Sequence, residues 1–189
     1  MRVEAVDAGA VIAAAGLFAS ARGGALQMTL IPRPAVGQYD GTATIRSVRV
    51  VDANVLAELL NAISVVGLLE QLNGPGLQFN DVEAGFLMTP DAIQVQHGSA
   101  VGASLGVSMS GIYRSATQKL EMDGVISPFY LLNGIGAILT RRGEGLFGFN
   151  YRLTGTANDP QVSVNPLSIL TPGMFRDIFR QPPPRLEGQ

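Results

Sequence analysis

The stretch from Gly143 to Gly173 constrains the fold most, because its first half alternates strictly between apolar and polar residues. Phe147, Phe149, Tyr151 and Leu153 fall on one face of a predicted strand, while polar or small residues fall on the other. A turn and a second short strand follow, and an Asn-Pro pair ends that strand because proline offers no N–H to a ladder. One hairpin cannot bury an apolar face alone, so earlier strands must supply the rest of the core.

Much of the preceding chain has the same alternation. Residues 25–31 and 42–51 read as strands, the second with more mixed faces, and residues 79–126 read as successive strands joined by short turns. His97 falls in phase with Ile93 and Val95 on one of these strands. The spacing predicts an antiparallel meander with one wet face and one dry face.

A second group of segments has helical periodicity instead. We expect helices over residues 8–19, 53–63, 65–72, 129–139 and 172–180. Asp7 and Asp52 stand where the side chain of an N-cap residue accepts a hydrogen bond from the first turn. The fold class is therefore α+β, a curved, open, groove-like antiparallel sheet with amphipathic helices covering its ends and one face.

The first helical segment also resembles a signal peptide, because its apolar run is followed by Ala19-Ser20-Ala21, which matches an A-x-A cleavage site. The acidic residues Glu4 and Asp7 before it have the wrong charge for such a leader, and the apolar run is shorter than the ~20 residues that span a bilayer. A helix is the better interpretation. The chain then has no convincing signal or anchor of its own.

Composition narrows the class of protein. The chain has 189 residues, 47% of them hydrophobic and only 15% charged, which is enough apolar material for one sizeable core. We expect a single domain over residues 1–180 and a disordered, proline-rich tail over residues 181–189. The net charge of −2 and the scattered arginines argue against nucleic acid as a partner. Without cysteine, thiolate metal sites are excluded.

No set of residues predicts catalysis. Residues 102–106 match the G-x-S-x-G pattern around Ser104, but a strand follows the serine where a helix is needed, and the one histidine, His97, precedes it. A single histidine without a partner makes a poor metal site. The carboxylate pairs Asp81/Glu83 and Glu121/Asp123 alternate with apolar residues, which is typical of a solvated strand face. We expect neither an enzyme nor a bound cofactor or metal.

Several segments together resemble a known family. They are GEGLF, YRLTGT, DPQVSVNPLS and PGMFR within residues 143–180, ARGG at 21–24, the segment from Val50 to Phe79, and GVISPFYLLN at 124–133. Taken in chain order, these segments cover nearly the whole sequence, and they resemble the C-terminal region of the AsmA-like (YhdP/TamB-type) bacterial envelope proteins. The resemblance implies a groove-shaped β-sheet in the periplasm, within a longer protein anchored in the inner membrane, that handles phospholipid between the inner and outer membranes.

The resemblance and the dry strand faces together give a functional hypothesis, a non-catalytic module that binds phospholipid acyl chains. The expected groove residues are Phe86, Met88, Val107, Met109, Leu120, Met122, Phe147, Phe149 and Tyr151. The expected contacts with a membrane or an envelope protein are Met174, Phe175, Ile178 and Phe179. Alternation does not say what covers the dry face, so the alternative is a structural or assembly module with a closed core and a protein partner.

Overall fold

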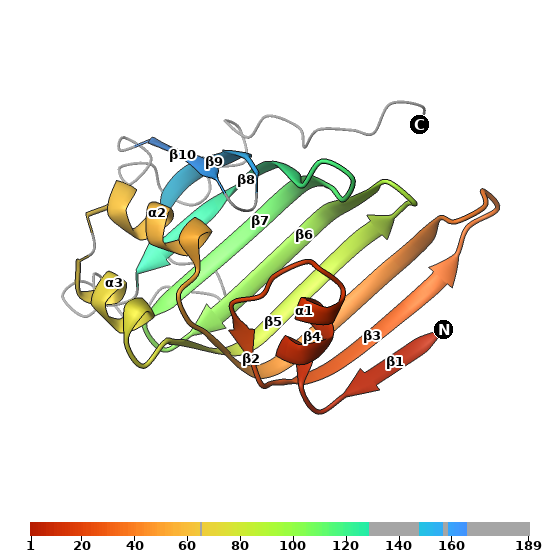
Figure 1. Ribbon diagram of the computed structural model, residues 1–189, viewed down its shortest axis with the longest axis horizontal. Coiled ribbons are helices and arrows are strands. Elements are labelled where there is room, and N and C mark those ends of the chain that lie inside the picture. Colours follow the sequence, from red (N-terminus) through yellow and green to blue (C-terminus); the bar gives the residue numbers. More distant parts are fainter. Residues whose placement is uncertain (65, 129–147, 157–158, 166–189) are drawn as a thin grey trace, which may run out of the picture.

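The fold is an open antiparallel sheet with a few short helices (Figure 1). The computed structural model describes residues 1–64, 66–128, 148–156 and 159–165. Over this part of the chain the strands are β1 (Arg2–Ala5), β2 (Ala21–Arg22), β3 (Ala25–Pro32), β4 (Tyr39–Val50), β5 (Leu77–Met88), β6 (Ala92–Gly102), β7 (Leu105–Arg114), β8 (Lys119–Pro128), β9 (Phe149–Gly155) and β10 (Pro160–Asn165). The helices are α1 (Ala8–Ala14), α2 (Asn54–Ala62) and α3 (Val66–Asn73).

The strands follow one another in nearly sequential order. The sheet runs β1-β3-β4-β5-β6-β7-β8-β9-β10, with β2 pairing the end of β4 beyond β3. Among the described strands, the two outermost ones, β1 and β10, do not pair with each other, so the sheet is not closed into a barrel. The predicted antiparallel meander is confirmed.

The strand registers gather the apolar side chains on one face, called here the apolar face. Residues directly opposite each other share a face. One row of partners crosses the sheet through Met28, Ala43, Ala84, Gly98, Met109, Gly124, Tyr151 and Val164. A neighbouring row crosses through Leu26, Ile45, Val82, Ala100, Val107, Ile126 and Phe149. The opposite surface, called the polar face, carries most of the charged residues of these strands.

Two irregularities keep the apolar residues on this face. Ser47 has a positive φ of 59°, and near it Asn80 bulges out of the β5–β6 pairing. The side-chain phase of β4 therefore changes, and Ile45, Val48 and Val50 are all buried. This explains the mixed alternation of the predicted 42–51 strand, because one left-handed residue shifts the period-2 pattern by one place.

The second irregularity lies in β6 and overturns one prediction. The register shifts between Val95 and Gly98, so Val95 and Gly98 share the apolar face. His97 pairs with Gly85, and its ring lies over that glycine, in the space that a Cβ at residue 85 would need. The prediction that His97 is in phase with Ile93 and Val95 is wrong, because the bulge turns it to the polar face.

The helix ends differ from the predicted ones. Asp7 caps α1 as expected, with its Oδ1 accepting from the backbone N–H of Ala10 at 3.0 Å. However, α1 ends at Ala14 rather than at residue 19, and the chain turns at Gly16 with a φ of 71°. The predicted cap at Asp52 is wrong. Ala53 is the N-cap of α2 without a side-chain hydrogen bond, and Asp52 itself has a φ of 50°.

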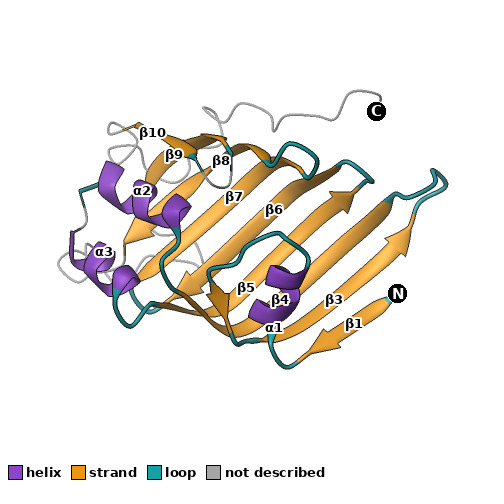
Figure 2. Ribbon diagram, viewed as in Figure 1, coloured by secondary structure: helices purple, strands orange, loops and turns teal. Residues whose placement is uncertain are grey.

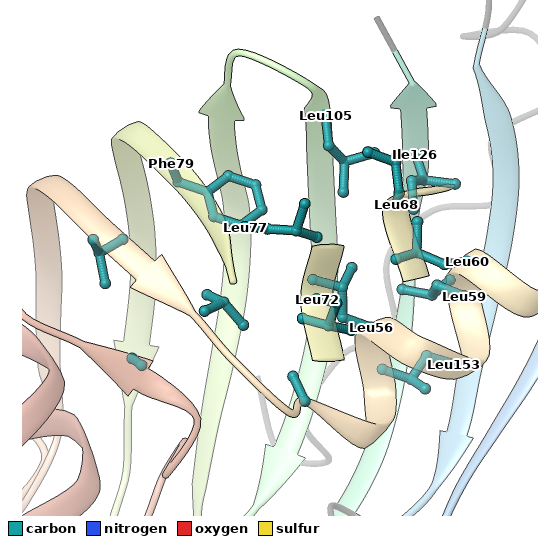
Figure 3. Packing of buried hydrophobic residues seen from close by; sticks show 14 of the residues in the cluster. Leu56, Leu59, Leu60, Leu68, Leu72, Leu77, Phe79, Leu105, Ile126 and Leu153 are labelled. Atoms are coloured by element: carbon teal, nitrogen blue, oxygen red, sulfur yellow. The ribbon is translucent and has the colours of Figure 1, made fainter. Parts of the chain in front are cut away.

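Helices α2 and α3 share their core with the sheet (Figure 3). Their leucines are buried in one cluster with residues of the apolar face, and they are Leu56, Leu59, Leu60, Leu68 and Leu72. In sequence these helices connect the neighbouring strands β4 and β5, yet α2 packs against β10 at the far edge. Burying each leucine contributes about 1.5–3 kcal/mol, so this packing ties the β4–β5 connection to the distant edge of the sheet.

Some predicted elements lie outside the described residues. They are the helices over residues 129–139 and 172–180, the strand position Phe147, and the tail over residues 181–189.

Candidate functional site

The predicted groove residues that the structure describes all lie on the apolar face. They are Phe86 and Met88 on β5, Val107 and Met109 on β7, Leu120 and Met122 on β8, and Phe149 and Tyr151 on β9. Phe147 lies outside the described residues. The registers therefore place side chains from four strands of the meander on one face, and three of these strands, β7, β8 and β9, are direct neighbours in the sheet.

These residues differ in how much of them reaches the surface. Met109 is 40% exposed, while Met122 and Tyr151 are only 6% and 4% exposed. The remaining ones are half-buried. Part of the apolar face is thus hydrophobic core, whereas the surface around Met109 is accessible to solvent. Figure 2 shows that the helices lie beside only part of the strands.

The side chain of Tyr151 extends from β9 across β8 toward β7, in the buried part of the apolar face. Its hydroxyl donates to the backbone carbonyl of Ser108 on β7 at 2.9 Å. The ring passes directly over Gly124, where an added Cβ would stand 2.6 Å from the hydroxyl oxygen. Burial raises the pKa of Tyr151 well above its ordinary value, and the negative charge of Asp123 raises this pKa further.

Phe86 occupies a similar position over β4. Its partner in register is Gly41, and a Cβ at residue 41 would collide with Cε2 and Cζ of the ring. The absence of a side chain at Gly41 is what lets the ring lie down on the neighbouring strand. Phe86 and Tyr151 therefore each depend on a glycine one strand away.

The polar face carries cross-strand ion pairs at the surface. Arg114 pairs with Glu121 at 3.0 Å and Arg152 with Asp123 at 2.8 Å. The hydrogen bond and the charge of Asp123 raise the pKa of Arg152. These carboxylates are the predicted pair Glu121/Asp123, and each of them is bound to an arginine at the surface.

Two buried apolar residues on the polar face escape the sequence reasoning. Leu87 and Ile112 are 1% and 0% exposed, and both pair with Gln94, which lies between them. They stand outside the main hydrophobic cluster. The sequence does carry a signal for them, because both interrupt the polar phase of an otherwise alternating strand.

Ser104 lies apart from the other candidate catalytic residues. Ser104 is in the turn between β6 and β7, so a strand follows it, as the sequence indicates. His97 is exposed on the polar face of β6, and Asp81 and Glu83 are exposed on the same face of β5. Within the described residues, no group of three or more His, Cys, Asp or Glu side chains is placed to hold a metal ion.

The structure defines a class of architecture, an open antiparallel sheet with one predominantly apolar face. No protein-family model, no curated protein and no solved structure matches the chain. In the described part of the chain, no helix has the length and apolar character needed to cross a membrane.

Proposed function

We propose that this protein is a non-catalytic lipid-binding module whose apolar face holds the acyl chains of phospholipid. In this proposal the helices cover the ends and part of one face of the sheet, and the rest of that face is an open groove. The headgroups stay in solvent, and no cofactor is needed.

One observation carries the proposal, the continuity of the apolar face from β3 to β10 on a sheet that does not close. An ordinary two-layer domain covers such a face with a second layer along its whole width. Met109 lies on β7, which has paired strands on both sides, and it still keeps 40% of its surface accessible. Exposed apolar area of this kind costs about 25 cal/mol per Å² in water, and burial under an acyl chain removes that cost.

The binding energy available is adequate for a transfer protein. Each acyl methylene removed from water contributes about 0.8 kcal/mol, so about twenty of them, on the two chains of one phospholipid, give roughly 16 kcal/mol. An association cost of about 8 kcal/mol then leaves a net free energy that corresponds to a micromolar dissociation constant. Binding of this strength would hold a lipid and still release it.

The resemblance to AsmA-like envelope proteins gives this proposal a cellular setting. As the terminal part of a longer β-groove protein, the module would handle phospholipid between the inner and outer membranes, in the periplasm. The proposed membrane or partner contacts, Met174, Phe175, Ile178 and Phe179, lie outside the described residues.

The alternative is a structural or assembly module of the cell envelope, and the deep burial of part of the face favours it. Ile126, Met122 and Tyr151 are 0%, 6% and 4% exposed. All three belong to the same hydrophobic cluster as the leucines of α2 and α3. If that packing extends over Met109 in solution, the face is simply a core and the function lies in a protein partner.

Mass spectrometry of organic extracts from the purified protein separates the two. We expect phospholipid near one equivalent per chain in the wild type, and loss of it in a folded Met109→Asp variant, because a carboxylate on the apolar face repels acyl chains. A double variant with Phe149→Asp should lose it completely. Thr42→Asp places the same charge on an exposed site of the polar face and should keep the lipid.

An empty wild type that also takes up no added phospholipid would rule out lipid binding and leave the assembly module. Equal loss of lipid in Met109→Asp and Thr42→Asp would show that charge alone, rather than the apolar face, decides binding.

A further inference from the structure

We infer that Gly41 and Phe86 together set the depth of the apolar face, so that this pair decides how much acyl chain the module can hold. The inference rests on the proposed function. It assigns a positioning role to Gly41, which does not itself contact the acyl chain. The pair is suited to this role by geometry, because one member is a ring lying flat and the other is the space beneath it.

The contact between the two residues is close and specific. The three atoms nearest to a Cβ at Gly41 all belong to the Phe86 ring, and the farthest of them, Cδ2, would be only 2.8 Å away. Real Cβ atoms do not approach other heavy atoms this closely, so any side chain at residue 41 must displace the ring. The nearest atoms belong to a side chain rather than to the backbone, so the ring can rotate away without breaking the β4–β5 ladder.

The displaced ring has few directions open to it. The sheet itself lies beneath it, and the added side chain now occupies its place on β4, so the ring must stand up from the sheet or turn towards Val95, its partner on β6. Both movements fill space above the half-buried residues around Phe86. The displaced ring therefore projects into the space where the acyl chain would lie, and the acyl chain loses contact with the residues around Phe86.

Gly124 provides the contrast that makes Gly41 informative. Tyr151 lies over Gly124 as Phe86 lies over Gly41, but there the nearest atom to an added Cβ is the backbone carbonyl oxygen of Ser108. A substitution at Gly124 therefore strains the β7–β8 pairing itself. Gly41 is the place where the depth of the face can be changed while the fold is kept.

The test is a double-mutant cycle on phospholipid binding, with dioleoylphosphatidylcholine vesicles as donor and a fluorescent acyl probe as reporter. We expect Gly41→Ala to weaken probe binding about tenfold, the effect of losing about two buried methylene groups. In a Phe86→Ala background the same substitution should change binding less than about twofold, because no ring remains to be lifted. Gly67→Ala on α3, where an added Cβ meets nothing within 4 Å, should bind as the wild type does.

Three outcomes decide the inference. Wild-type affinity in a folded Gly41→Ala variant overturns it, and so does an equal loss from Gly41→Ala with and without the ring. A Gly41→Ala variant that does not fold also contradicts it, because the inference requires the Phe86 ring to move aside while the β4–β5 ladder is kept. A wild type that binds no probe at all refutes the proposed function instead, which keeps the two failures distinct.

Discussion

Tyr151 offers the sharpest test of the packing, because its buried side chain links three strands. We predict that Tyr151→Phe lowers the free energy of unfolding by about 1–1.5 kcal/mol at neutral pH, the usual contribution of one hydrogen bond. The bond to the carbonyl of Ser108 is 2.9 Å long and the side chain is 4% exposed, so water cannot replace the lost hydroxyl.

The difference between the two proteins should shrink in alkali. The pKa of Tyr151 is raised in the folded state, so its phenol stays protonated there while the unfolded chain releases the proton near the ordinary value of 10.0. The contribution of the protonated phenol to the free energy of unfolding is fully present below pH 10. Above pH 10 it falls by about 1.4 kcal/mol per pH unit. The wild type therefore loses about 1.4 kcal/mol more than Tyr151→Phe between pH 9 and about pH 11, where the two should become nearly equal.

Urea unfolding at constant ionic strength, followed by circular dichroism at about pH 8, 9, 10 and 11, measures this convergence. Phe149→Leu is a matched control, because it trims an apolar side chain on the same strand and face without a titrating group. Its stability curve should run parallel to that of the wild type. A constant gap between the wild type and Tyr151→Phe across this pH range would refute the burial and hydrogen bonding assigned to the phenol.

Three further predictions concern packing, charge and backbone. Leu72→Ala should cost about 2–5 kcal/mol in urea unfolding, because Leu72 is fully buried, and Leu69→Ala on the half-buried side of α3 should cost clearly less. Arg114→Ala should cost under about 1 kcal/mol and the loss should fade with added salt, because the pair with Glu121 is exposed. Gly111→Ala should abolish cooperative thermal unfolding, because its φ is 145° and a Cβ would collide with the backbone carbonyl oxygen of Glu121.

Alternation is enough to predict the meander and to place most side chains on the right face. Phe149, Tyr151 and Leu153 share the apolar face with Val107 and Met109, as the sequence predicts. Backbone geometry fixes the two-residue period of a strand, so any strand with one buried face shows alternating apolar residues in its sequence.

Local irregularities are beyond this reasoning. The bulge in β6 that turns His97 to the polar face and the left-handed Ser47 in β4 each shift the phase by one residue. Ser47 carries no glycine or Asn-Gly signal that would mark it in the sequence. The β6 shift does end at a glycine, Gly98, but an isolated glycine in a strand does not by itself fix where the chain bulges. The wrong cap at Asp52 has the same origin, because its φ of 50° turns the chain before α2 begins.

The coverage of the apolar face could not be predicted from the sequence, because it depends on where the β4–β5 connection lies. Ile126 and Met109 both alternate correctly and both face the same side, yet one is 0% and the other 40% exposed. Ile126 belongs to the cluster that holds the leucines of α2 and α3, and Met109 does not. The difference follows from α2, which leaves β4, packs on β10 and returns through α3 to β5, next to where it began. Two short helices on this path reach only part of each strand, so residues farther along the same strands keep their surface. The feature that supports the proposed groove is therefore set by a connection between neighbouring strands and only indirectly by the strands that would line it.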